Sequence, residues 1–168
     1  LQISEFMADN AHTLRDDDGD RVDWIEIQNT GNTAASLENW GLSTDPTKPL
    51  LWQFPAVIVP QGGFLIVYAS GKNRSQANQP LHTNFKLSKS GGYLALTTPS
   101  GQVVSAFPSY PSQSADVSYG RVAGDSPFRS RISACSRIWS SRSLMPVPFL
   151  ADTSVCSVWP PNSSSTTL

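Results

Sequence analysis

Prolines and glycines interrupt this chain so often that long regular elements are excluded. Thirteen prolines and eleven glycines are spread over 168 residues. No window of about 11 to 18 residues keeps apolar side chains at the i, i+3, i+4, i+7 spacing of an amphipathic helix. The length allows one domain with a core and is too short for two full domains. We therefore expect a single all-β domain built from short strands.

Apolar segments separated by turn residues recur through the first 120 residues. Residues 22–29 alternate, with two isoleucines on one face and a tryptophan and a glutamate on the other. The unbroken apolar run at 64–69 predicts a strand buried at the centre of the fold. Tyr110 and Tyr119 are expected to pin the extended segment 105–121 onto the sheets. This pattern predicts an antiparallel β-sandwich of immunoglobulin-like size, with strands near 2–8, 22–29, 36–43, 52–54, 64–69, 82–87, 93–98 and 102–107.

A block of aspartates stands immediately before the alternating strand. Asp16, Asp18 and Asp20 alternate, Asp23 follows three positions later, and Gly19 supplies a turn. Calcium accepts 6 to 8 oxygen ligands in loose geometry, so such carboxylates can converge on one ion. The pattern is not an EF-hand, because the glycine stands fourth rather than sixth and an isoleucine occupies the twelfth position. These four aspartates are the predicted ligands of a structural calcium ion.

The same block has a simpler interpretation, which stays open here. It can be a solvated acidic hairpin loop, in which Asp23 accepts hydrogen bonds from backbone amides. Five carboxylates within eight residues repel one another, so leaving all of them unpaired has a cost.

No other residues in the sequence form a recognisable catalytic set. His12 and His82 lack partners at metal-ligand spacing and are expected to be hydrogen-bonded structural histidines. Residues 70–72 lack the first glycine of a phosphate-binding loop. Glu5 and Glu26 can form a carboxylate pair, but we expect each to accept hydrogen bonds at the sheet margin. The sequence predicts that this domain has no catalytic residues and is not an enzyme.

Charge and hydropathy exclude two classes of partner. Residues 1–120 carry seven Lys and Arg against eleven Asp and Glu, which leaves no basic surface for nucleic acid. The longest apolar run has six residues, against about 20 for a membrane-spanning helix. The chain begins at Leu1 rather than methionine, and we expect this end to be a cut inside a longer precursor.

Seven segments together resemble the lamin tail domain, in the form found in bacterial surface and secreted proteins. They include Asn-Trp-Gly-Leu-Ser at 39–43, Leu-His-Thr-Asn-Phe-Lys-Leu at 81–87 and Asp-Val-Ser-Tyr-Gly-Arg at 116–121. The likeness covers residues 1–121 almost continuously. The segments are 3–8, 16–29, 39–43, 52–55, 67–72, 81–87 and 116–121.

The resemblance implies an immunoglobulin-like module of a larger protein, often beside hydrolase, nuclease or adhesive domains. We therefore predict a non-catalytic extracellular or cell-surface module. It would contact neighbouring domains or bind a protein or carbohydrate ligand, with calcium as a structural cofactor. One alternative is an accessory domain of a secreted hydrolase or nuclease. Another is a nuclear lamin tail that binds chromatin, which the acidic balance and the absence of rod heptads disfavour.

The likeness stops after Arg121. Residues 122–168 contain twelve serines, no lysine and no glycine after Gly124. We expect this Ser/Arg/Pro-rich tail to be irregular and Cys135 and Cys156 to form no framework disulfide. A frameshift in a GC-rich gene explains the composition, and a natural Ser/Pro-rich linker is the alternative.

Overall fold

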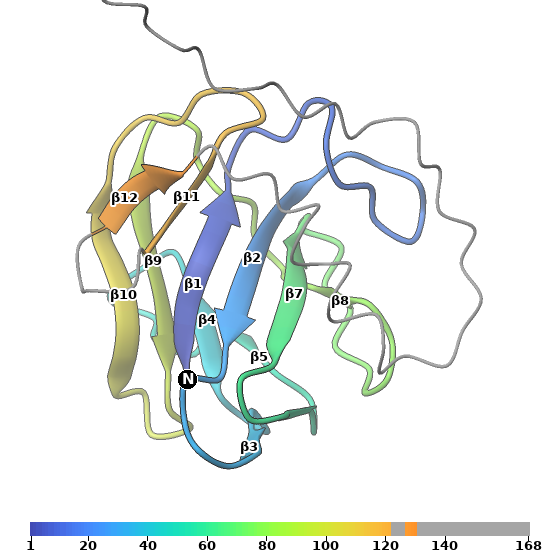
Figure 1. Cartoon of the computed structure of the whole chain (residues 1–168), viewed down its shortest axis with the longest axis vertical. Helices are drawn as coiled ribbons and strands as arrows, with labels where there is room; N and C mark the ends of the chain where they lie inside the picture. Colours follow the sequence, from blue (N-terminus) through green and yellow to red (C-terminus); the bar gives the residue numbers. More distant parts are fainter. Residues whose placement is uncertain (122–126, 131–168) are drawn as a thin grey trace, which may run out of the picture.

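Two packed β-sheets make up the architecture (Figure 1). The structure is a computed structural model that describes residues 1–121 and, for the backbone alone, 127–130. These described residues contain strands and turns but no helix. The strands are β1 (Gln2–Met7), β2 (Asp23–Gln28), β3 (Ala35–Ser36), β4 (Gly41–Ser43), β5 (Trp52–Gln53), β6 (Ile58–Val59), β7 (Phe64–Ala69), β8 (Leu81–His82), β9 (Gly92–Thr97), β10 (Val103–Tyr110), β11 (Ser118–Arg121) and β12 (Pro127–Ser130).

The larger sheet has the order β12-β11-β1-β2-β7-β8, and the smaller one has the order β10-β9-β4-β5. A short pair, β3 with β6, lies apart from both. All neighbours are antiparallel except β7 and β8. An all-strand fold of two packed sheets, antiparallel except for that one short pair, confirms the predicted immunoglobulin-like β-sandwich.

The hydrophobic core fills the space between the two sheets. Phe6 of β1 has no exposed surface and contacts three aromatic rings, those of Phe107, Tyr110 and Tyr119, at centroid distances of 5.2, 4.8 and 5.6 Å. Both tyrosines are buried, so they pin the segment that follows β9 onto the larger sheet, as predicted. Offset and edge-on ring pairs of this kind add to the free energy gained from burying apolar area.

A second, smaller apolar cluster lies on the outer face of the larger sheet. Trp24 of β2 is completely buried there, against Met7. Leu14, Ile66 and Tyr68 are half-buried around the pair. Because side chains alternate along a strand, β7 sends alternate residues into the main core and into this outer cluster. Its unbroken apolar run therefore reflects two apolar environments, and its outer face is half-buried rather than fully buried.

Some elements differ from the sequence-based expectation. The strand expected at 82–87 is reduced to the two residues of β8, because Thr83 turns the chain by donating its hydroxyl proton to the Phe85 carbonyl at 2.6 Å. The β3 and β6 pair was not predicted, since two-residue strands leave no periodicity to detect.

β11 and β12 extend the larger sheet beyond β1. β12 lies within the predicted tail at 122–168, and the structure describes no other part of that tail. The domain boundary predicted after Arg121 therefore stays a prediction. Cys135 and Cys156 lie outside the described residues. Within the described part of the chain, no helix is long and apolar enough to cross a membrane.

Candidate functional site: a charge cluster at one end of the larger sheet

The pairing of β2 with β7 determines where the aspartate block lies. The two strands are antiparallel, with Asp23 opposite Ala69. The segment that enters β2 and the segment that leaves β7 therefore meet at the same end of the sheet. We call residues 15–21 the acidic loop and residues 70–80 the 70–80 loop.

The acidic loop is a tight hairpin organised by Asp16. A bridge between Arg15 and Arg21 closes its base. Gly19 has a backbone φ of 84°, which residues other than glycine rarely adopt. The Asp16 side chain is buried, and its Oδ1 accepts hydrogen bonds from the amides of Asp18 and Asp20 at 3.1 and 2.8 Å. Asp16 thus fixes the loop from inside, as Asx turns do.

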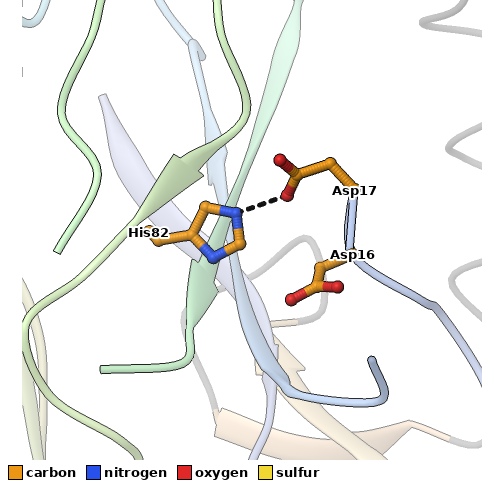
Figure 2. A group of neighbouring side chains, drawn as sticks. All are labelled: Asp16, Asp17 and His82. Carbon is orange, nitrogen blue, oxygen red and sulfur yellow. Dashed lines mark hydrogen bonds and ion pairs between the residues drawn. The ribbon is translucent and has the colours of Figure 1, made fainter. Parts of the chain in front are cut away.

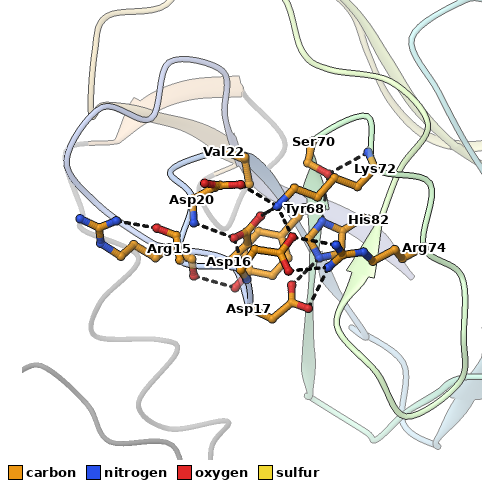
Figure 3. Close-up of polar contacts among 12 residues, drawn as sticks. Arg15, Asp16, Asp17, Asp20, Val22, Tyr68, Ser70, Lys72, Arg74 and His82 are labelled. Atoms are coloured by element: carbon orange, nitrogen blue, oxygen red, sulfur yellow. Dashed lines mark hydrogen bonds and ion pairs between the residues drawn. The ribbon is translucent and has the colours of Figure 1, made fainter.

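Lys72 of the 70–80 loop contacts three of the carboxylates. Its Nζ donates to Asp16 and Asp20 at 2.6 and 2.9 Å (Figure 3). It also donates to Asp18 at 2.5 Å. Desolvation acts to lower the pKa of Lys72, but hydrogen bonds to the three aspartates outweigh it and hold the pKa above its ordinary value. Lys72 therefore stays charged and occupies the position between the carboxylates where a cation would bind.

Arg74 pairs with the outer side of the same loop. Its Nη1 lies 3.0 Å from Asp17 Oδ2, and its Nη1 and Nη2 donate to the two oxygens of Asp18 at 3.1 and 2.7 Å. Hydrogen bonds from Arg74 and then from Lys72 lower the pKa of Asp18 to about 2. This two-pronged arrangement is the geometry in which arginine recognises a carboxylate.

His82 of β8 contacts both loops through its ring nitrogens. The ring has no exposed surface and packs on Tyr68 at a centroid distance of 5.1 Å. Its Nε2 lies 2.7 Å from Asp17 Oδ1 (Figure 2). Its Nδ1 lies 2.9 Å from Ser70 Oγ. A carboxylate only accepts, so in the neutral ring Nε2 carries the proton and Nδ1 accepts the Ser70 hydroxyl proton.

Ser70, His82 and Asp17 thus form the residue types of a hydrolase triad, but their orientation is inverted. In a triad the serine faces the substrate and the aspartate is buried. Here Ser70 is 6% exposed while the Asp17 side chain is 34% exposed. The amide of Lys72 also donates to Ser70 Oγ at 3.1 Å. This geometry is that of a structural hydrogen-bond chain, and it agrees with the prediction that His82 is a hydrogen-bonded structural histidine.

We define the charge cluster as seven charged or titratable residues that hydrogen-bond or ion-pair with one another between the acidic loop and the segment 72–82. Two sets of three within it offer ligand atoms that lie within 4.8 Å of one another: Asp16, Asp18 and Asp20 form one set, and Asp16, Asp17 and His82 form the other. The full cluster is Asp16, Asp17, Asp18, Asp20, Lys72, Arg74 and His82.

Asp23 belongs to neither set, although it was one of the four predicted ligands. It lies at the start of β2, where its carboxylate accepts hydrogen bonds from the backbone of Asn10 and Leu87. Burial raises the pKa of Asp23 to about 6 against the lowering effect of these bonds. Backbone hydrogen bonding is the alternative role that the sequence left open for this residue.

The other residues considered from the sequence have structural partners. Glu5 and Glu26 lie opposite each other on β1 and β2, and both are buried. Ser4 donates to Glu26 at 2.6 Å, and Ser118 donates to Glu5. His12 lies 2.8 Å from Asp116 and is hydrogen-bonded as predicted.

Lys72 and Arg74 were not among the residues predicted to form this site. A signal for them existed, since both follow directly on the apolar run of β7. Recognising it requires knowing that β7 pairs antiparallel with β2, and no local pattern specifies that pairing.

The fold and the arrangement of these motifs agree with a comparison against protein families. The family model described as Lamin Tail Domain matches residues 1–110. The chain belongs to the lamin tail domain family. Neither a curated protein nor a solved structure matches it. All seven residues of the charge cluster lie inside the part of the chain that matches the lamin tail domain, whereas β11 and β12 lie beyond it.

Proposed function

We propose that this lamin tail domain is a non-catalytic module of an extracellular or cell-surface protein. Its role would be to space neighbouring domains or to bind a protein or carbohydrate ligand. The observation that supports this proposal best is the inverted Ser70–His82–Asp17 chain, in which the hydroxyl that would attack a substrate is buried. The charged side chains around it bond to one another and join two loops. A general acid or base instead needs a substrate within hydrogen-bond reach.

Turnover assays on the full chain test the absence of catalysis. We expect no hydrolysis of ester, phosphodiester, peptide or glycoside substrates, and Ser70→Ala should leave that background unchanged. Hydrolysis that disappears in Ser70→Ala, or in Glu5→Gln or Glu26→Gln, would overturn the proposal. The Gln102→Ala variant, in an exposed turn, serves as the matched control.

We also propose that Asp16, Asp18 and Asp20 can exchange the Lys72 ammonium for calcium. Their oxygens already converge, and four aspartates of the charge cluster face only two permanent cations. Hard carboxylate oxygens are the ligands that calcium prefers. Asp23 is not part of this proposal, because its carboxylate is bonded elsewhere.

Melting curves in calcium and in chelator test the exchange. A ligand that binds only the folded state stabilises it by about 2.7 kcal/mol at 100 times its Kd, so millimolar calcium should raise the Tm. Lys72→Met removes the competing ammonium and should show the larger shift, while Asp18→Asn with Asp20→Asn should abolish it. Identical curves with and without calcium, in both wild type and Lys72→Met, would exclude the calcium site.

A further inference from the structure

A polar hollow opens beside the charge cluster. It is lined by Asp17 and by six residues of the 70–80 loop, and its volume is about 440 Å³. Ligand sites in proteins commonly have volumes of about 300 to 1,000 Å³. The lining residues include Asn73, Gln76 and Gln79, which carry side-chain amides and are exposed.

The base of this hollow is held in place by backbone hydrogen bonds. Arg74 and His82 exchange two amide-to-carbonyl bonds, each of 2.9 Å, and the Asn73 amide donates to the Thr83 carbonyl at 3.0 Å. The His82 ring in turn contacts Asp17, which also lines the hollow. A site fixed in this way before binding loses less conformational entropy when a ligand arrives.

The charges in the wall are already paired with each other. Arg74 contacts Asp17 and Asp18, and Asp17 also contacts His82. Asp17 and Arg74 are the two charged residues of the lining and are paired with each other, so the lining itself offers no unpaired counter-charge to an anion or a cation. The wall therefore favours a ligand without net charge.

We propose that this hollow binds a neutral saccharide. Side-chain amides both donate and accept, which matches neighbouring hydroxyl groups of a sugar ring. Pro80 is the one apolar residue in the lining, so the hollow offers little surface for the apolar side chains that anchor a peptide. The inference rests on the proposed function, since it selects carbohydrate from the ligand classes named there and assigns it a site.

Saturation-transfer NMR on the full chain tests the proposal. The probes are methyl glucoside, methyl galactoside, methyl mannoside and N-acetylglucosamine, together with their short neutral oligomers. We expect transfer to at least one of them. The double variant Gln76→Ala with Gln79→Ala should weaken binding at least about tenfold, because each amide contributes hydrogen bonds to the ligand.

The matched control is the double variant Gln61→Ala with Gln102→Ala, which removes two exposed glutamines outside the lining of the hollow. It should bind like wild type, and both double variants should keep the wild-type Tm. Transfer to no saccharide, or equal binding by both double variants, would overturn the inference. Capture of a peptide from a library without any saccharide binding would also overturn it, while leaving the module proposal intact. Hydrolysis of a probe would instead contradict the module proposal.

Discussion

At the scale of single residues, four aspartates close in sequence have four different environments. Asp16 is buried and organises the acidic loop, Asp17 bonds to His82, and Asp18 is paired with two cations. Asp23 is held by backbone amides in a desolvated position. The pKa of the aspartate side chain is therefore lowered to about 2 at Asp18 and raised to about 6 at Asp23.

Asp23 should make stability depend on pH in an unusual direction. Its pKa is 3.8 in the unfolded chain and about 6 in the folded protein, so the folded state holds the proton more tightly. The stability that Asp23 contributes by holding its proton is complete below about pH 4 and is lost as the pH rises through 6. Between pH 4 and 7 we expect the free energy of unfolding to fall by about 2 kcal/mol on this account.

Urea denaturation of wild type and Asp23→Asn at both pH values measures this effect. The neutral amide should remove the dependence, and the difference between the two proteins isolates Asp23 from other titrating groups. Equal pH slopes in both proteins would contradict the assignment. The range stops at pH 4 because carboxylates with a lowered pKa, such as Asp18, lose their stabilising contribution below it.

At the scale of elements, two loops at one end of the β2 and β7 pair act as a unit. The acidic loop covers the outer apolar cluster, since Leu14 packs near Trp24 and the Tyr68 hydroxyl donates to the Arg15 carbonyl at 3.1 Å. Lys72 then joins that loop to the 70–80 loop. The acidic loop is therefore held on one side by the outer apolar cluster and on the other by Lys72.

Lys72→Met should destabilise the protein more than loss of an ordinary surface lysine. It leaves the buried Asp16 carboxylate without its cation, which should cost about 2 kcal/mol after allowance for solvent screening. Lys48→Met is the control, because Lys48 is 67% exposed and lies 3.5 Å from Asp45. That change should cost less than about 0.5 kcal/mol. Denaturation in chelator compares the two, and equal stabilities would show that Lys72 is not a structural counter-ion.

At the scale of the whole molecule, the main core is closed by a strand that lies outside the family match. The match ends at residue 110, yet Tyr119 of β11 packs against Phe6 and Phe107. Arg121 also donates to the Ala106 carbonyl at 2.5 Å and lies over the Phe107 ring. Among the residues whose side chains the structure describes, the buried core cluster extends from Ile3 to Tyr119.

Two truncations should therefore have opposite outcomes. A chain that ends at residue 130 keeps every described strand, and its Tm should stay within about 4 °C of the full chain. A chain that ends at Asp116 loses β11 with Tyr119, which should lower the Tm by more than about 10 °C or prevent folding. Calorimetry measures both. A large drop on removing residues 131–168 would show that the tail contributes to the fold.

The sequence by itself determined the class of fold and the positions of the long strands. β1, β2, β7, β9 and β10 were predicted because alternation and turn residues are local signals that side-chain direction imposes on any strand. The aspartate block was recognised for the same reason. Its members are close in sequence and had to be close in space.

Only the tertiary structure decided what the aspartates contact. Lys72 and His82 reach them across 52 to 65 residues, and those contacts depend on the pairing of β2 with β7. The same pairing places Asp23 inside the sheet, away from the other predicted ligands. The parallel pairing of β7 with β8 brings Ser70 and His82 together. Local patterns specify which residues form strands, but the choice of strand partner depends on burial across the whole domain, and that choice placed the cations beside the acidic loop.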